Sequence, residues 1–490
     1  MIIMRIWIFI ALFFTTVLAA AQPETYTQIY SGSSYDEGIA AFRLPNKEIR
    51  IIGNTGSFGH GSTDIWLIAL DSNANFLWHK FYGGSQIEKA SSAVMNSKGD
   101  IFIVGSTTQN LSASYQVYFL GLDQYGQIIG YNDYGGSDWD LGKGICLIND
   151  TTFALVGETF SHGNGQGDVF VLKVNQHGDT AWTKIYGESV EDFGASIKLT
   201  PDGGFIVAGA TKSFGNGSFD SYMLRLNAQG DSLWTKSVEH ITDAEFMDVV
   251  VNPDTSFTFC GYRKDTLNTY RDINLEKYDK NANLVWSGFN SLSEGKESYA
   301  KSLIRENNGH YTFCGITTKY AHSQFSDARV VRTLSTGWWE ASASLGDNKQ
   351  DVGSFIGLDN FHGKHYFMVG TTKSYGINMS ALYFVRLDSN LKTDTTRNLI
   401  FPTSIEPISN SIILKTYPNP TDNILYIEHP IVSKVISIKV FDIQGREVSV
   451  KWRAELDNKI SISTQNLSKG LHFLTLQTLK NTITIRFIKS

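Results

Sequence analysis

The sequence lacks three features that would each have pointed to a different class of protein. No helical periodicity runs through it, and after the first 21 residues no apolar run is long enough to cross a bilayer. Neither charge is in large excess, because 42 basic residues face 48 acidic ones for a formal net charge of −6. We therefore expect no nucleic-acid partner and no anionic membrane surface as a partner. Proline is also scarce, at nine residues against 44 glycines, a balance that suits many tight turns.

The first 21 residues have the three parts of a secretory signal peptide. Arg5 supplies the positive charge, Ile6–Leu18 form an apolar run, and Ala19–Ala21 provide small residues at a cleavage site. The run is too short and too terminal to be a stable membrane span. No cysteine lies near the cleavage site, so a lipoprotein anchor is not expected. We expect an exported mature protein that is monomeric and has no membrane span.

Glycine marks a repeat with a period of 52 residues. A glycine closes an apolar stretch in each copy, and the last two members follow small insertions: Gly53, Gly105, Gly157, Gly209, Gly261, Gly315 and Gly370. The copies have the pattern of four short strands, of which the seventh copy shows three, and the turn between the third and fourth carries an Asx and a glycine, as in "NQHGD" at 175–179. A four-strand unit repeated seven times predicts an all-β fold, a seven-bladed β-propeller over residues 22–395.

The strand that the seventh copy lacks is present at the other end of the chain. The seventh copy has no counterpart of the tryptophan-containing fourth strand. The segment "YTQIYSG" at 26–32 aligns with "WHKFYGG" at 78–84, which belongs to a fourth strand. We therefore expect the N-terminal strand to complete the last blade and close the ring.

Two further repeat positions have structural explanations. Cys260 and Cys314 directly precede repeat glycines where other copies carry aliphatic residues, so we expect buried free thiols. The position five residues after Asp168 and its equivalents is basic in the third to seventh copies. We expect these side chains to pack along aromatic neighbours with their charged groups in water: Lys173, Arg225, Lys277, Arg332 and Arg386.

Acidic residues recur at the junctions between copies and form the candidate ligand face. They stand where the fourth strand of one copy leads into the first strand of the next: Asp36, Glu88, Asp140, Asp192 and Asp351. First strands line the central channel of a propeller, so these carboxylates would ring one of its mouths. Hydrogen bonding between blades is the alternative. A second acidic set begins the third strands, and we expect it to hold the preceding loops by accepting backbone N–H bonds: Asp64, Asp168, Asp220, Asp272 and Asp327.

The sequence contains no motif for catalysis, for a metal or for a cofactor. The H-E-x-x-H, G-x-S-x-G and EF-hand patterns are absent, and the 11 histidines are scattered without ligand spacing. We therefore expect no catalytic residue, no metal and no cofactor. A ligand site should break the seven-fold symmetry, so unique residues carry most weight. Trp338 and Trp339 form one such pair, with packing at the outer edge as the alternative.

After residue 395 the repeat stops. Residues 396–412 have the composition of a linker, and residues 413–490 alternate strands and turns in the manner of a small immunoglobulin-like β-sandwich. Three motif elements precede the basic end "RFIKS": "YPNP" (Tyr417, Pro418, Asn419, Pro420), "VFDIQGREV" around Asp442 and Gly445, and "LSKGLHFL" around Gly470.

These elements, in this order, resemble the type A C-terminal sorting domain of the Bacteroidota type IX (Por) secretion system. The third element of that family usually has Gly-x-Tyr, whereas here Gly470, Leu471 and His472 precede Phe473. The resemblance implies that the outer-membrane translocon recognises this domain, and that the protein is displayed on the cell surface or released. It does not say what the propeller does.

Three functions are open for the propeller. Export, polar loops gathered on one face and the lack of a catalytic set favour a binding protein for a glycan or a protein. A polysaccharide-active hydrolase or lyase that uses channel carboxylates as acid and base is the second hypothesis. The third is a structural component of the envelope with no small ligand.

Overall fold

The computed structural model describes residues 25–490 apart from gaps at 109–113, 216, 241, 265–269, 289–296, 319–320, 322–323, 378, 395–396, 401–414, 418–420, 429–434, 443–445, 456–458, 479–481 and 490. The predicted signal peptide, residues 1–21, lies outside the described residues. The chain divides into two compact units, Met1–Thr403 and Ser404–Ser490, and each is described by itself.

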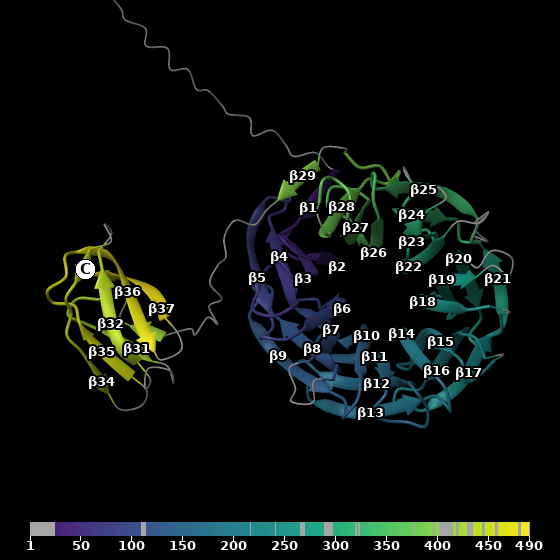
Figure 1. Cartoon of the computed structure of the whole chain (residues 1–490), viewed down its shortest axis with the longest axis horizontal. Helices are drawn as coiled ribbons and strands as arrows, with labels where there is room; N and C mark the ends of the chain where they lie inside the picture. The colour runs from purple at the N-terminus through teal and green to yellow at the C-terminus, as the bar shows by residue number, and fades with distance from the viewer. Residues whose placement is uncertain are drawn as a thin grey trace, which may run out of the picture. The chain divides into compact units, whose positions relative to one another are not determined.

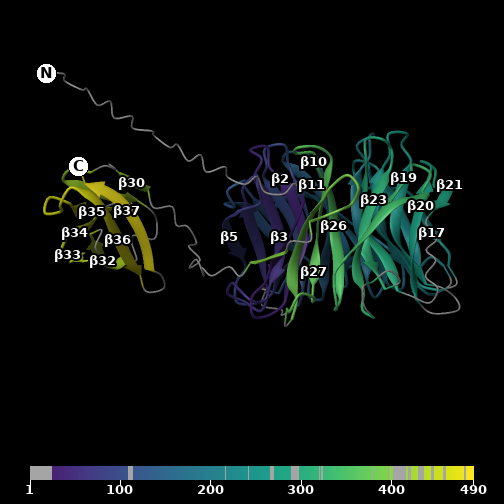
Figure 2. The same ribbon diagram turned by 90° about the horizontal axis from the view of Figure 1, so that it is seen from above.

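Seven sheets form a ring around a common axis, in chain order and with the first strand of each blade innermost (Figure 1). Figure 2 shows the same ring from its edge. The strands of blades 1 to 4 are β2 (Asp36–Arg43), β3 (Ile49–Thr55), β4 (Asp64–Leu70), β5 (Phe76–Tyr82); β6 (Glu88–Met95), β7 (Ile101–Thr107), β8 (Gln116–Leu122), β9 (Ile128–Tyr134); β10 (Asp140–Asn149), β11 (Thr152–Thr159), β12 (Asp168–Asn175), β13 (Thr180–Tyr186); and β14 (Asp192–Leu199), β15 (Phe205–Thr211), β16 (Asp220–Leu226), β17 (Ser232–Val238).

The strands of blades 5 to 7 follow the same order. They are β18 (Ala244–Val251), β19 (Phe257–Lys264), β20 (Arg271–Tyr278), β21 (Leu284–Gly288); β22 (Ser298–Arg305), β23 (Tyr311–Thr317), β24 (Asp327–Thr333), β25 (Trp339–Leu345); and β26 (Asp351–Asp359), β27 (His365–Thr372), β28 (Ala381–Leu387), with β1 (Tyr26–Tyr30) and β29 (Arg397–Ile400) at the outer edge. The all-β fold and the seven blades that the sequence predicts are confirmed.

The two middle strands of a blade are buried and its outer strand is partly exposed. Every residue of β3 and β4 is buried, whereas β5 begins with two exposed residues and is buried at only two of its seven positions. Runs of isoleucine, leucine and valine suit a strand that is covered on both faces by the neighbouring blades. The outer strand is less covered by the neighbouring blades, and it therefore carries more polar residues.

Each innermost strand has a β-bulge at its fourth residue. The register with the second strand skips one residue there, for example Ser91 between Ala90 and Ser92, and the same skip occurs in the other six blades. The bulge brings the inner backbone against the repeat glycine, because a Cβ on Gly105 would lie 1.8 Å from the carbonyl oxygen of Lys89. The 52-residue glycine signal therefore marks a close approach between two backbones.

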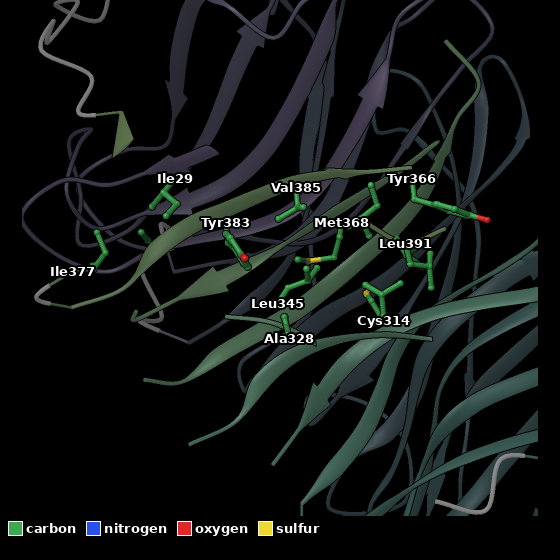
Figure 3. Close-up of a cluster of buried hydrophobic side chains, with 14 residues drawn as sticks. Ile29, Cys314, Ala328, Leu345, Tyr366, Met368, Ile377, Tyr383, Val385 and Leu391 are labelled. Carbon is green, nitrogen blue, oxygen red and sulfur yellow. The ribbon is translucent and has the colours of Figure 1, made fainter. Parts of the chain in front are cut away.

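The N-terminal strand closes the ring, as predicted. β1 pairs antiparallel with β28, with Tyr26 opposite Arg386 and Tyr30 opposite Leu382. Ile29 of β1 joins a buried cluster contributed by blades 6 and 7, which includes Tyr383 (Figure 3). The two ends of the propeller are thus joined by main-chain hydrogen bonds and by apolar packing.

A short strand lies in the segment that the sequence analysis assigns to the linker. β29 pairs in parallel with β1, with Thr27 opposite Arg397 and Tyr30 opposite Ile400. β1 would otherwise be the outermost strand of its sheet, with unpaired N–H and C=O groups. The last blade therefore has five strands, the fifth formed by residues 397–400 of the segment assigned to the linker.

The thiols match the prediction, but two of the basic residues do not. Cys146, Cys260 and Cys314 are buried and free. The prediction that the charged groups face water is wrong for Arg225 and Arg386, which are 7% and 4% exposed. A carboxylate pairs with each guanidinium: the exposed Asp202 with Arg225, and the buried Asp359 with Arg386.

The C-terminal unit consists of two four-stranded sheets. Their strand orders are β30-β31-β35-β34 and β33-β32-β36-β37, with bounds β30 (Lys415–Tyr417), β31 (Ile424–Glu428), β32 (Val435–Phe441), β33 (Glu447–Val448), β34 (Trp452–Glu455), β35 (Lys459–Ser463), β36 (Gly470–Thr478) and β37 (Thr482–Lys489). Aliphatic residues of both sheets form one buried core, including Leu425, Val440, Ile460 and Leu474. No described helix of the protein has the length and apolar character needed to cross a membrane.

Candidate functional site

The five junction acids begin the innermost strands, and all are buried. The carboxylate of Asp36 accepts hydrogen bonds from the hydroxyls of Thr55 at 2.5 Å and Ser57 at 2.7 Å, and from the N–H of Gly32 at 2.8 Å. These donors come from the end of the second strand, the loop after it and the junction before the blade. Burial raises the pKa of the Asp36 carboxyl in spite of them.

The same contacts recur in the other blades that carry the acid. Asp140, Asp192 and Asp351 accept from the Oγ atoms of Ser161, Ser213 and Ser374 at 2.7, 2.6 and 2.7 Å. Glu88 accepts from the N–H of Gly84 at 2.6 Å and from Thr107 Oγ1 at 3.1 Å. Each of these carboxylates links the start of the innermost strand to the junction or loop residues that surround it. It would have to lose hydrogen bonds in order to contact a ligand.

Two aspartates of the second set hold their loops as predicted. Asp64 accepts from the N–H groups of His60 and Gly61 at 2.9 and 3.0 Å. Asp168 accepts from those of Asn164 and Gly165 at 3.0 and 3.2 Å. The repeated acids of the sequence are therefore built into the scaffold of the ring.

The central channel contains a cavity of about 460 Å³ that the innermost strands of all seven blades line. These strands, β2, β6, β10, β14, β18, β22 and β26, stand nearest the axis in Figure 1. The charged residues of its lining differ from blade to blade: Glu37, Lys89, Lys143, Lys198, Glu245, Asp248 and Lys301. This set does not follow the blade repeat, whereas the junction acids recur at one repeat position in five of the blades.

The β-bulges explain why two of the lysines reach the cavity. Lys143 lies between Gly142 and Gly144, where the register of β10 skips, and Lys301 occupies the same position in β22. The extra residue of a bulge has no partner in the ladder and points away from the sheet. Here that direction is the channel.

Three of the four lysines are neutralised by carboxylates. Lys89 pairs with Glu37 at 3.0 Å and Lys198 pairs with Asp248 at 3.1 Å. Lys143 pairs with Glu158 at 2.9 Å, and its ammonium also lies 3.6 Å from the ring centre of Phe193. These pairs bring charge to the channel wall while leaving little net field from these residues.

Lys301 and Glu245 have no such partner. Among the described residues no carboxylate forms an ion pair with Lys301, whose Nζ reaches Ser354 Oγ at 3.4 Å. Burial lowers the pKa of Lys301 and raises the pKa of Glu245 to about 7. The channel therefore holds one unpaired ammonium and one carboxyl that titrates near neutral pH.

The sequence-based candidate residues are not the ones that line this cavity. The candidates are the first residues of these strands, because an acid repeats there. The cavity is lined by the fourth and fifth residues of every innermost strand, and in blades 1, 2 and 5 also by the second. The sequence feature that could have identified the channel residues is a residue type that differs between copies at the same repeat position. Lysine stands at the fourth position of the innermost strand only in blades 3 and 6. Comparing the copies in sequence does not reveal the bulge that directs this fourth residue towards the channel.

The remaining predicted residues lie away from the channel. Trp338 and Trp339 are 75% and 57% exposed at the start of the outer strand of blade 6. The part of the chain that the structure describes contains no group of three or more His, Cys, Asp or Glu residues able to hold a metal ion. The absence of a cofactor remains an expectation from sequence.

Three motif residues of the C-terminal unit fall within described segments. The carboxylate of Asp442 accepts from the N–H of Arg446 at 3.0 Å and from its guanidinium at 2.7 Å. Gly470 begins β36 with a φ of +127°, which favours glycine, and Tyr417 ends β30. The other four residues lie outside the described residues: Pro418, Asn419, Pro420 and Gly445.

Comparison with known proteins addresses the two units separately. Residues 415–490 match the family model of the secretion system C-terminal sorting domain. No curated protein sequence matches the chain.

Solved β-propellers are similar to the chain in structure. The WD40 domain of Neurospora crassa Pan2 has a TM-score of 0.42 at 10% identity, over 73% of this chain and 91% of that one. The β-propeller domain of the Trilobed protease from Pyrococcus furiosus has a TM-score of 0.41 at 10% identity, over 78% and 98%.

The match at the C-terminus confirms the resemblance found in the sequence motifs, and a sorting domain of this kind interacts with the secretion machinery. The seven sheets and the closing N-terminal strand define the unit that precedes it. The chain is thus a β-propeller protein that carries the C-terminal sorting domain of the type IX (Por) secretion system, which directs export to the cell surface or the extracellular medium.

Proposed function

We propose that this protein is an extracellular binding protein without enzymatic activity, and that its ligand, a glycan or a protein segment, enters the central channel. The observation that carries this proposal is the charged lining of the channel. It departs from the blade repeat, whereas the residues that hold the blades follow the repeat. A scaffold needs the repeated residues but has no need of different side chains around its axis.

The cavity has the size expected of a ligand site. Its volume of about 460 Å³ falls within the roughly 300–1,000 Å³ of typical ligand pockets. Its lining combines charged groups with serines and a few apolar side chains such as Ile39 and Met247. A mixture of this kind suits a polar ligand with one apolar face.

The carboxylates favour binding over hydrolysis. A glycosidase uses two carboxyl groups on either side of the scissile bond. In the channel, Glu37 and Asp248 are held in ion pairs and Glu245 is the carboxyl without one. The five junction acids are buried and hydrogen-bonded. The pKa of Glu245, raised to about 7 by burial, is the observation that favours a hydrolase or lyase as the second candidate.

The test uses the mature chain, residues 22–490, immobilised and offered to a panel of polysaccharides and envelope extracts. Retention and released reducing ends are scored in the same tubes. Ser91→Trp fills the channel from an exposed position of β6, and Thr180→Trp adds the same bulk to an exposed position of the outer strand β13. We expect retention by the wild type and by Thr180→Trp, and loss of retention in Ser91→Trp.

Two outcomes would contradict the proposal. Unchanged retention in Ser91→Trp would place the ligand outside the channel. Release of reducing ends that Glu245→Gln abolishes would identify an enzyme.

A further inference from the structure

We propose that the channel recognises an acidic sugar, whose carboxylate or sulfate group binds Lys301 and whose hydroxyls bind the surrounding serines. The inference rests on the proposed binding function of the channel and specifies the ligand class. Three of the four channel lysines are paired with carboxylates of the protein, and the fourth, Lys301, is not paired with any in the part of the chain that the structure describes.

Lys301 is the channel cation that is available to a ligand. The ammonium groups of Lys89, Lys143 and Lys198 each lie within 3.1 Å of a protein carboxylate. Lys301 has no carboxylate partner among the described residues. A ligand that binds one of the paired lysines must compete with a fixed carboxylate, whereas a ligand that binds Lys301 displaces only water or a weak hydroxyl contact.

The surroundings of Lys301 favour an anion over a neutral group. Burial lowers the pKa of its ammonium, which means that the channel disfavours the charge in the absence of a partner. A bound carboxylate or sulfate compensates this cost through a charge-assisted hydrogen bond. Glu37, Lys89 and Glu245 are the other charged groups that act on Lys301 from β2, β6 and β18.

Hydroxyl groups beside Lys301 can receive the rest of a sugar. Ser354 Oγ accepts from Lys301 Nζ at 3.4 Å, and Ser302 Oγ accepts from the N–H of Ile356 at 3.3 Å. Each oxygen already acts as an acceptor, so its O–H is directed elsewhere and can donate to a ligand. Ser91 and Ser92 line the same cavity from β6.

A cationic ligand fits this channel less well. Glu37 and Asp248 are ion-paired, and Asp248 additionally accepts from Ser196 Oγ at 2.7 Å and from the N–H of Leu303 at 2.9 Å. Glu245 remains, and its carboxyl is half protonated near pH 7. The unpaired positive charge is therefore the stronger attraction at neutral pH.

The experiment measures binding of small probes to the mature chain, residues 22–490, by calorimetry at pH 6.5. The probes are glucuronate and glucose 6-sulfate, with glucose, acetate and inorganic sulfate as controls. The two acidic sugars share the anionic group and distinguish a carboxylate source from a sulfate source. We expect at least one of them to bind, and glucose, acetate and sulfate to bind about tenfold or more weakly.

Variants test the role of Lys301. Lys301→Met should weaken the acidic sugar by about tenfold or more, and Lys301→Arg should restore much of the affinity because the charge remains. Lys98→Met removes an exposed lysine from the turn between β6 and β7 and should leave binding unchanged. Thermal unfolding of each variant establishes that the ring is intact, and Lys301→Arg carries the test if Lys301→Met does not fold.

The outcomes separate this inference from the proposed function. Equal binding of glucose and glucuronate, or equal binding in Lys301→Met and the wild type, overturns the inference. Acetate or sulfate binding as tightly as the sugars also overturns it, since the site would then read charge alone. If no probe binds while Ser91→Trp still abolishes retention of the polysaccharide panel, the inference fails and the channel function stands. If Ser91→Trp retains the panel as the wild type does, both fail.

Discussion

At the scale of single residues, the channel of this protein contains a carboxyl whose charge the fold disfavours. Glu245, at the second position of β18, has no hydrogen bond to its carboxyl from the described residues and a pKa raised to about 7 by burial. The charged and titratable groups that act on it come from five other strands: Lys143, Glu158, Tyr262, Arg271, Tyr299 and Lys301. The nearby cations reduce the shift but do not cancel it.

This shift predicts a pH-dependent effect of Glu245→Gln on stability. The folded-state pKa of Glu245 lies above the unfolded value of about 4.3, so its favourable contribution is complete below that value and is lost as the pH rises towards 7. Glutamine cannot ionise. The variant should therefore match the wild type near pH 4.5 and be more stable by ~1–3 kcal/mol at pH 8. Urea unfolding at the two pH values measures the difference, and a gain that does not change with pH would contradict the assignment.

At the scale of the element, the repeating unit depends on one backbone contact between its first two strands. The bulge at Ser91 brings the carbonyl oxygen of Lys89 to 1.8 Å from where a Cβ of Gly105 would lie. The atom in the way is backbone and is held by the pairing of β6 and β7. It cannot move aside without breaking that register.

Gly105→Ala should therefore destabilise the propeller by roughly 1–3 kcal/mol, the cost of overpacking a tight contact. The matched control is Ser106→Ala, at the next position of the same strand, where the change removes an oxygen from a residue that is 7% exposed. Denaturant midpoints of both variants give the comparison. Equal midpoints for Gly105→Ala and the wild type would mean that the glycine marks something other than this contact.

The sequence predicts the parts of an element that repeat and misses those that depend on tertiary contacts. Gly105 and its equivalents revealed the period, and "YTQIYSG" revealed the closing strand, because a repeat exposes positions where one residue type is required. Lys301 was missed, since only the bulge decides that the fourth residue of an innermost strand faces the channel. β29 was missed because its four residues form a strand only beside the open edge of β1.

At the scale of the whole molecule, the ring closes between blade 7 and blade 1 with charged groups as well as strands. Asp359, at the end of β26, is fully buried and accepts from Arg43 of blade 1 at 2.6 Å and from Arg386 of blade 7 at 2.7 Å. The guanidinium of Arg43 also lies over the ring of Phe361 at 4.4 Å. One carboxylate thus joins the first and the last blade.

Asp359→Asn should open this junction. The buried guanidinium of Arg386 and the mostly buried one of Arg43 would lose their carboxylate, and removing one partner of a buried ion pair costs roughly 3–5 kcal/mol. Asp254→Asn is the control, because the carboxylate that pairs with Lys277 at 2.9 Å is 60% exposed and the pair should contribute under about 1 kcal/mol. Urea unfolding at pH 7 measures both variants, and similar losses in the two would contradict the role assigned to Asp359.

The same carboxylate predicts how the closed ring responds to acid. Burial alone would raise the pKa of Asp359, but Arg43 and Arg386 outweigh burial and hold it below its usual range. Its stabilising contribution is therefore complete above the unfolded pKa of about 3.9 and is lost as the pH falls through the lower, folded-state value. The stability gap between the wild type and Asp359→Asn should be constant from pH 7 to about pH 5 and should shrink below about pH 4. A gap that persists undiminished in acid would show that the aspartate acts through packing and not through its charge.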